Sequence, residues 1–190
     1  RPSSIEDYIG QSHLTEKKKI LSSFIDGEKL FSIILWGPPG SGKTTLARIL
    51  INHSGYELFQ ISAISSGIKD LREIIDKSKV NKSMGKNSVL FIDEIHRFNK
   101  TQQDSLLNAI ENGTLVLIGA TTENPSFEII SPLLSRARVL RLNSLDIDDM
   151  NTIIDKALNY DIVLSKKSYN LPEESRKFLI TQSGGDARKL

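Results

Sequence analysis

The stretch GPPGSGKT, residues 37 to 44, decides how the rest of the chain is interpreted. It fits the pattern G-x-x-x-x-G-K-[ST] and stands between an apolar segment and an amphipathic one. Its glycines allow the backbone to turn N–H groups inward around phosphate, and the following helix adds its positive N-terminal end. Lys43 is placed to reach the outer phosphates, and Thr44 offers a hydroxyl to Mg²⁺. The alternative is a glycine-rich turn with a solvent-facing lysine. The candidate nucleotide-binding residues here are Gly37, Pro38, Pro39, Gly40, Ser41, Gly42, Lys43, Thr44 and Thr45.

Short apolar segments alternate with amphipathic segments on both sides of this stretch. Three of the apolar segments are nearly continuous runs, which is typical of strands covered on both faces. The amphipathic segments repeat apolar residues at helical spacing, as Leu46, Ile49 and Leu50 do. This alternation predicts an α/β fold with a parallel sheet. The predicted strands are FSIILW (31–36), YELFQIS (56–62), NSVLFID (87–93), TLVLIGA (114–120) and RVLRL (138–142).

The composition restricts the class of protein. The 190 residues, 38% of them hydrophobic, suffice for one sizeable domain, alone or with a small second one. A formal net charge of +2 argues against a polycation that coats nucleic acid, so any such contact must come from a local patch. The lack of cysteine excludes disulfides and thiolate metal sites. No apolar run approaches the roughly 20 residues that span a membrane, so we expect no membrane partner. Because the chain starts at Arg1 rather than Met, we expect it to be an excerpt of a longer protein.

The segment VLFIDE, residues 89 to 94, supplies two carboxylates at the end of a predicted strand. Asp93 can lie near a Mg²⁺ ion that Thr44 also binds. Glu94 can orient and deprotonate a water molecule for attack on a γ-phosphate. The alternative for Glu94 is a surface carboxylate. An acidic pair of this kind favours hydrolysis over transfer of phosphate to a small molecule.

The segment GATTEN, residues 119 to 124, ends the next predicted strand. Ligands of open α/β sheets bind at the carboxyl ends of the strands. Thr122 or Asn124 can therefore hydrogen-bond a γ-phosphate or the attacking water. Turn formation before Pro125 explains either residue equally well.

The alternating pattern ends near residue 143. Two amphipathic segments follow, the second being LPEESRKFLITQSGG, and Asp146 is a candidate N-cap of the first. A third helix is expected to begin at Asp186. The chain is therefore predicted to consist of an α/β domain, residues 1–143, and the start of a small helical domain, residues 144–190.

Several motifs in their order along the chain resemble those of AAA+ ATPases. They are GPPGSGKT, FIDEIHRF, IGATTENPSF, SPLLSRARV and GGDAR. The pair of DEIHRFNKTQQD and ATTENPSF is more specific, and it resembles the replication-associated recombination protein A family (RarA or MgsA). The eukaryotic relative of that family is the Werner-helicase-interacting ATPase. The opening RPSSIEDYIGQSHL is also similar, so the resemblance extends over essentially the whole chain.

The resemblance implies an AAA+ domain with sheet order 5-1-4-3-2, followed by a helical lid. It places Ile9 and Gly10 against the adenine of ATP. Lys43 and Thr44 then hold phosphate and Mg²⁺.

The same resemblance gives roles to residues beyond the phosphate loop. Asp93 holds the metal, and Glu94 is the catalytic base. Asn124 is favoured as the sensor of the γ-phosphate, with Thr122 as the alternative. Arg188 in GGDAR matches the second sensor, which reaches down from the lid; without the resemblance it would be a surface arginine of a helix.

The stretch SPLLSRARVLRL, residues 131 to 142, contains three arginines and no acidic residue. Arg136 resembles an arginine finger, which neutralises charge on the γ-phosphate of a neighbouring subunit. It therefore implies an oligomer with ATP at each interface. Arg138 and Arg141 are interpreted as surface or edge-strand residues.

The implied function is a DNA-dependent ATPase that acts on stalled or damaged replication forks. The implied partners are DNA with single-strand/double-strand junctions, further copies of the chain in a tetramer, and single-strand-binding or other replication proteins. Candidate DNA contacts are the hydroxyl and backbone groups of Ser65, Ser66 and Gly67, with Lys69. A solvated polar face with i,i+4 pairs such as Lys69 with Glu73 explains this segment equally well. The alternatives are a clamp-loader subunit, a Holliday-junction motor, and a structural ATP-binding recruitment module. The expected location is the bacterial cytoplasm or the eukaryotic nucleus.

Overall fold

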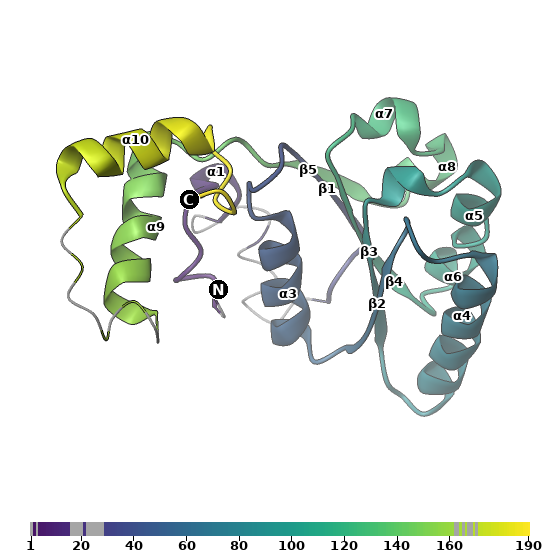
Figure 1. Ribbon diagram of the computed structural model, residues 1–190. Coiled ribbons are helices and arrows are strands. Elements are labelled where there is room, and N and C mark those ends of the chain that lie inside the picture. Colours follow the sequence, from purple (N-terminus) through teal and green to yellow (C-terminus); the bar gives the residue numbers. More distant parts are fainter. Residues whose placement is uncertain are drawn as a thin grey trace.

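The computed structural model describes residues 2, 4–15, 21, 29–161, 164, 166, 169 and 171–190. Five parallel strands form one sheet in the order β2-β3-β4-β1-β5 (Figure 1). This is the predicted order 5-1-4-3-2 viewed from the other side, so the fold prediction is confirmed. The strands are β1 (Ile33–Trp36), β2 (Glu57–Ser62), β3 (Ser88–Asp93), β4 (Val116–Thr121) and β5 (Arg138–Arg141).

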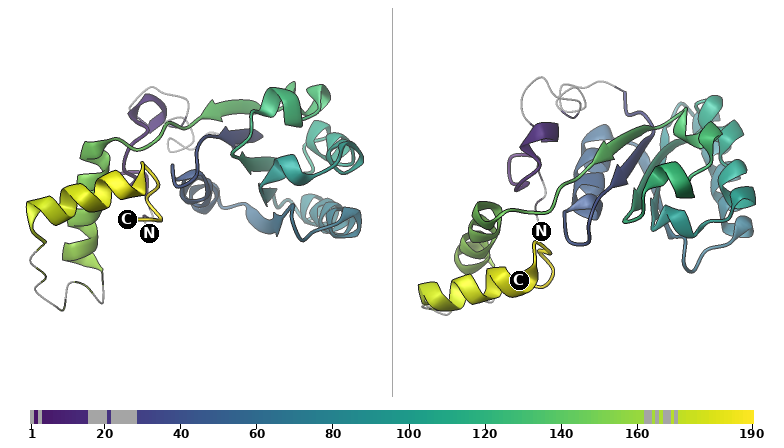
Figure 2. Two further views of the ribbon diagram at one scale, coloured as in Figure 1. Left: turned by 45° about the horizontal axis from the view of Figure 1, so that its top comes forward. Right: turned by 90° about the horizontal axis from the view of Figure 1, so that it is seen from above.

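Helices cover both faces of the sheet. α3 lies on one face, and α4, α5 and α6 lie on the other (Figures 1 and 2). The helices are α1 (Ser12–Thr15), α3 (Lys43–Ser54), α4 (Ile68–Ser83), α5 (Lys100–Asp104), α6 (Leu107–Glu111), α7 (Pro125–Glu128), α8 (Ser131–Leu134), α9 (Ile147–Tyr160) and α10 (Glu173–Ser183), with the 3₁₀ turn η1 (Ile95–Arg97).

The central strand β3 shows why the apolar runs are continuous. Val89 and Phe91 belong to the hydrophobic cluster on the α3 side of the sheet. Leu90 and Ile92 belong to the cluster on the α4 side, and all four side chains are almost completely buried. Each such side chain contributes about 1.5 to 3 kcal/mol through burial, so both layers are needed to stabilise the strand.

The register brings the ends of three strands to one edge of the sheet. Trp36, the last residue of β1, pairs with Thr121, the last residue of β4. In β3, Ile92 pairs with Gly119 of β4, so Asp93 also lies at this edge. The phosphate loop, the acidic pair and the segment after β4 therefore start side by side, as the sequence predicted.

The helices α9 and α10 lie beyond α3, away from the sheet (Figure 2). Asp146 caps α9, because its carboxylate accepts a hydrogen bond of 2.8 Å from the Asp149 N–H. The helix expected to begin at Asp186 stays a prediction, since residues 186–189 form a single turn with a hydrogen bond of 3.0 Å from the Lys189 N–H to the Asp186 carbonyl oxygen. Where the two domains divide stays a prediction.

Candidate functional site

The phosphate loop follows β1 and leads into α3. Gly40 and Gly42 have φ angles of 70° and 95°, which are conformations that residues with a Cβ rarely adopt. The Lys43 ammonium group donates hydrogen bonds of 2.8 Å to the carbonyl oxygens of both Gly37 and Pro38. Lys43 is therefore folded over the loop, and its side chain is oriented by the backbone that surrounds it.

The electrostatic surroundings of Lys43 show which groups share this site. Burial lowers the pKa of its ammonium group, since a charge is poorly solvated there. Glu94 counteracts this effect most, followed by Asp93 and Asp186, whereas Arg188 adds to it. Asp93 at the end of β3, Glu94 directly after it, and Asp186 and Arg188 of the lid are therefore close enough to act on the charge of Lys43. The sequence predicted that Asp93, Glu94 and Arg188 belong to the same site as Lys43, but it did not predict Asp186.

The segment before α1 covers the loop from the other side. The Tyr8 hydroxyl and the Gln11 amide each lie 3.4 Å from the Ser41 carbonyl oxygen. Gln11 also exchanges two hydrogen bonds of 2.8 Å with the backbone of Asn143, in the linker between β5 and α9. Gln11 thus connects the phosphate loop to the start of the lid.

Tyr8 and Gln11 were not predicted as site residues. Within the segment DYIGQ, the resemblance gave a role only to Ile9 and Gly10. Tyr8 is buried against Gly42, and burial, aided by the Asp149 charge, raises the pKa of its hydroxyl. The sequence pointed to Gln11 only as a polar residue next to Gly10, in a segment that lies far from the phosphate loop in sequence. The adenine contacts of Ile9 and Gly10 stay predictions.

The acidic pair after β3 is held in an unusual turn. Glu94 has a φ of 54°, one of two positive values among the described non-glycine residues. The turn is closed by a hydrogen bond of 2.8 Å from the Arg97 N–H to the Glu94 carbonyl oxygen. The Glu94 carboxylate lies 3.4 Å from Nδ1 of His96. A strained conformation of this kind persists only where the surrounding structure enforces it.

The two candidate sensors after β4 have different surroundings. The side chain of Asn124 caps α7, accepting a hydrogen bond of 3.0 Å from the Ser126 N–H. Thr122 is half-buried directly after the strand. The cap occupies the Asn124 oxygen and leaves its amide N–H groups as donors. The structure therefore does not decide between the two residues.

The lid touches the phosphate loop through the turn that contains GGDAR. Asp186 is pressed against Gly40, where any added Cβ would overlap its carboxylate. The same carboxylate accepts hydrogen bonds from Arg188, of 2.9 Å from the backbone N–H and 3.4 Å from Nε. Arg188 is otherwise 68% exposed. Asp186 therefore places the guanidinium of Arg188 beside the loop.

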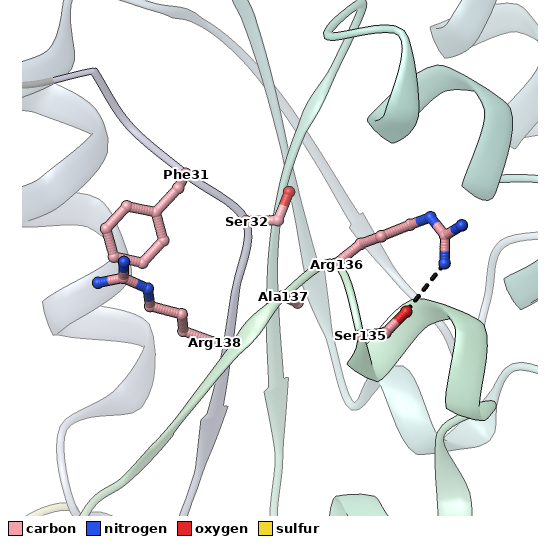
Figure 3. Close-up of a pocket in the computed structure, with 6 residues that line it drawn as sticks. All are labelled: Phe31, Ser32, Ser135, Arg136, Ala137 and Arg138. Atoms are coloured by element: carbon pink, nitrogen blue, oxygen red, sulfur yellow. Dashed lines mark hydrogen bonds between the residues drawn. The ribbon is translucent and has the colours of Figure 1, made fainter.

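Arg136 lies at the opposite edge of the sheet, just before β5 begins beside the start of β1. Its guanidinium forms an ion pair with Glu111 at the end of α6 and donates a hydrogen bond of 2.9 Å to the Ser135 hydroxyl (Figure 3). It borders a cavity of about 270 Å³ whose lining includes Phe31 and Arg138. Arg136 thus lies away from the phosphate loop of its own chain.

The other two arginines of this stretch stack on aromatic rings of the neighbouring chain segment. Arg138 lies 4.2 Å from the ring centre of Phe31 (Figure 3), and Arg141 lies 5.2 Å from that of Trp36. Cation–π contacts at exposed sites stabilise by about 0.5 to 1 kcal/mol each. The interpretation of both as edge-strand residues is confirmed.

The candidate DNA-contacting loop before α4 offers fewer donors than expected. The N–H groups of Ser65 and Ser66 donate to the Ser62 carbonyl oxygen, and the Gly67 N–H donates to the Asp70 carboxylate. Phosphate would have to replace these partners, so the expectation that the backbone groups bind it stays a prediction. The serine hydroxyls and the exposed Lys69 are the other candidates for such contacts.

The donors near Lys43 are suited to Mg²⁺. The described residues contain no group of three or more His, Asp or Glu that could hold a metal alone. Mg²⁺ is commonly bound by one or two protein oxygens together with substrate phosphates and water. The Thr44 hydroxyl at the start of α3 and the Asp93 carboxylate at the end of β3 fit that pattern.

Phosphate loop, acidic pair, sheet order and helical lid together define an ATPase of the phosphate-loop class. The chain belongs to the AAA family, the "ATPase family associated with various cellular activities", whose model matches residues 33–145. This confirms the predicted ATP hydrolase. Among the described residues, none of the helices has the length and apolar character needed to cross a membrane.

Relatives of this chain carry the names that the sequence motifs predicted. It is 46% identical to replication-associated recombination protein A of Escherichia coli K12, over the whole chain and 42% of that protein. It is 45% identical to ATPase WRNIP1 of Dictyostelium discoideum, over 99% of the chain and 22% of that protein. The chain therefore spans less than half the length of both relatives.

A solved structure shares the fold. The RuvB Holliday-junction branch-migration motor of Thermotoga maritima superposes with a TM-score of 0.78 at 31% identity. The match covers the whole chain and 62% of the RuvB chain. The resemblance to RuvB is thus weaker in sequence than the resemblance to the two relatives above.

Proposed function

We propose that this chain is the ATP-hydrolysing part of an oligomeric machine that acts on DNA at stalled or damaged replication forks. The observation that carries the proposal is the convergence of Lys43, Asp93, Glu94 and the lid at one edge of the sheet. The names of the 46% and 45% identical relatives support the link to replication and recombination.

Hydrolysis follows from the arrangement of the side chains. Lys43 and the loop N–H groups bind the phosphates, and the helix α3 adds its positive end. Glu94 accepts a proton from water while the water oxygen bonds to the γ-phosphorus. The bond from that phosphorus to the bridging oxygen breaks, which releases ADP and phosphate. Thr122 or Asn124 orients the γ-phosphate or the water from the neighbouring strand.

The Thr44 hydroxyl and the Asp93 carboxylate would hold Mg²⁺. The ion, when bound, neutralises charge on the β- and γ-phosphates. Ile9 and Gly10 are assigned to the adenine.

Arg136 and Arg188 complete the site from two directions. Arg188 reports on the γ-phosphate within its own subunit, since Asp186 already holds it near the loop. Arg136 lies at the opposite edge of the sheet, so it serves the site of a neighbouring subunit. An arginine supplied in this way contributes about 10³ to 10⁵ in rate. We propose a tetramer for the full-length protein.

The test is steady-state ATP hydrolysis by the full-length protein with and without DNA. The DNA set contains a single-strand/double-strand junction, a fork and a four-way junction. We expect junction DNA to stimulate hydrolysis and both Glu94→Gln and Arg136→Ala to abolish it, with ATP binding retained. Arg138→Ala is the matched control, because it removes an exposed arginine two residues away.

Two results would change the proposal. Hydrolysis that is indifferent to DNA and survives Arg136→Ala would remove both the interface argument and the DNA-directed role. A response restricted to four-way junctions would instead favour a branch-migration motor like the structural neighbour RuvB.

A further inference from the structure

A buried histidine lies beside the acidic pair, Asp93 and Glu94, and has no part in the hydrolysis described so far. His96 follows Glu94 by two residues, and its side chain is only 8% exposed. Its Nδ1 atom lies 2.9 Å from the Thr121 hydroxyl oxygen and 3.4 Å from the Glu94 carboxylate. Thr121 is fully buried at the end of β4, next to the candidate sensor Thr122. One imidazole nitrogen thus stands between the catalytic carboxylate and the sensor strand.

The position of His96 is fixed by packing rather than by the histidine itself. Ile95 is fully buried and lies directly against Gly119 of β4. A Cβ at Gly119 would come within 3.0 Å of the Ile95 side chain, so the glycine makes the close approach possible. The turn η1 is therefore docked on β4, and the next residue along the chain meets Thr121.

The hydrogen-bonding chemistry allows two arrangements. Nδ1 carries at most one proton, so it cannot donate fully to Glu94 and to Thr121 at once. When Nδ1 carries the proton, it donates to the Thr121 hydroxyl oxygen and lies 3.4 Å from the Glu94 carboxylate, while the Thr121 hydroxyl donates to the Glu123 carbonyl oxygen 3.3 Å away. When Nδ1 accepts from Thr121, the hydroxyl turns away from Glu123, and no Nδ1 proton remains to attract the Glu94 carboxylate. The hydroxyl of Thr121 thus selects whether His96 restrains the base.

We infer that His96 is a positioning residue that sets the orientation of the Glu94 carboxylate and couples it to the end of β4. The inference rests on the proposed function, because it gives His96 a role in the same hydrolysis. A shift of the segment after β4, where Thr122 or Asn124 is proposed to contact the γ-phosphate, changes the hydrogen bonding of Thr121. His96 then passes that change to Glu94.

The test compares His96→Ala, His96→Asn and His96→Gln in steady-state and single-turnover ATP hydrolysis by the full-length protein. The asparagine amide can take the place of Nδ1, whereas the glutamine amide reaches the place of Nε2. We expect His96→Ala and His96→Gln to lower kcat by about tenfold to a hundredfold, the range for a misplaced catalytic group. His96→Asn should recover to within about threefold of wild type. The dissociation constant of a fluorescent ATP analogue should stay within about twofold.

A second pair of variants tests the coupling without changing the histidine. Thr121→Val removes the hydroxyl with little change in shape, and Thr121→Ser keeps it. We expect Thr121→Val to lower kcat and Thr121→Ser to retain it, with unchanged analogue binding in both. A low kcat in Thr121→Ser together with a normal kcat in Thr121→Val would show that the volume of the side chain matters and its hydroxyl does not. That result would overturn the inference.

The Glu94→Gln background separates this inference from the proposed function. If His96 acts through Glu94, the residual single-turnover rate of Glu94→Gln should not fall further in the double variant His96→Ala/Glu94→Gln, and a further fall of about tenfold would overturn the inference. A kcat of His96→Ala equal to wild type, with Glu94→Gln inactive, would overturn the role of His96 and leave the ATPase intact. Undiminished hydrolysis by Glu94→Gln would instead overturn the proposed function.

Discussion

The contact between Gly40 and Asp186 can be tested by adding a single methyl group. Gly40 has a φ of 70°, and a Cβ there would overlap the Asp186 carboxylate. Gly40→Ala should therefore destabilise in two ways. The left-handed conformation costs about 1 to 2 kcal/mol for a residue with a Cβ. The overlap forces the lid turn to move and adds about 1 to 3 kcal/mol, the usual cost of overpacking.

The chain contains a matched control for the conformational part. Gly55, the C-cap of α3, has a φ of 66°, and a Cβ there would meet no atom within 4 Å. Gly55→Ala should thus cost about 1 to 2 kcal/mol of unfolding free energy. Gly40→Ala should cost about 2 to 5 kcal/mol, the sum of both parts.

The assay is urea unfolding of four proteins: wild type, the two alanine variants, and Gly40→Ala combined with Asp186→Ala. The thermal midpoint provides a check, because 1 kcal/mol corresponds to roughly 2 to 4 °C in a chain of this size. Asp186→Ala removes the overlap with the carboxylate but keeps the overlap with the Asp186 Cα, which lies 2.6 Å from the added Cβ. We therefore expect the double variant to recover only part of the difference between Gly40→Ala and Gly55→Ala. Equal losses in Gly40→Ala and Gly55→Ala would refute the claim that the lid turn rests on the loop.

Two further predictions concern side chains that surround the loop. Because burial lowers the pKa of Lys43 below its ordinary value of about 10.4, the folded state binds fewer protons there than the unfolded state. The unfolding free energy contributed by this group should rise as pH increases between the lowered and the ordinary pKa. Urea unfolding from pH 8 to 10 should show a smaller rise in Lys43→Met than in wild type. Tyr8→Phe should lower the unfolding free energy by less than about 1 kcal/mol, since the 3.4 Å hydrogen bond is long, whereas Tyr8→Ala should cost about 3 kcal/mol through the cavity it leaves. Equal losses in the two Tyr8 variants would show that the hydroxyl, not the ring, stabilises this contact.

Most of the sheet could be predicted because its signals are local. The strand β3 is a continuous apolar run that ends in two carboxylates, and both faces of it are buried as that pattern requires. The phosphate loop was predicted with equal ease, since the glycines and Lys43 are neighbours in sequence. The strand bounds differ from the predicted ones by at most two residues.

The turn around Asp186 has a local cause that the periodic pattern did not reveal. Gly184 and Gly185 both have positive φ angles, 57° and 82°, so the chain leaves α10 in an irregular turn. The Asp186 carboxylate then accepts the backbone N–H of Arg188, two residues ahead. Asn124 accepts the Ser126 N–H in the same way where it caps α7, so this bond is compatible with a helix start. The bond also holds Arg188 near the loop.

The residues that join the parts of the site could not be predicted from sequence. Gln11 and Asn143 lie 132 positions apart in sequence. His96 in the turn η1 and Thr121 at the end of β4 lie 25 positions apart. Each contact needs the sheet to be formed first, because only the register determines which ends meet.

The linker before α9 is contacted by both segments that cover the phosphate loop. Gln11 binds the Asn143 backbone, and Leu145 lies against both Gly10 and Gly185. The N-terminal segment and the GGDAR turn therefore contact one linker as well as one phosphate loop, through Ser41 and Gly40 respectively. A displacement of the phosphate loop must then move the linker, or else both the N-terminal segment and the GGDAR turn, because close-packed groups do not deform continuously. The chemistry of the site is set by residues adjacent in sequence, and its connection to the lid is set by residues that only the fold brings together.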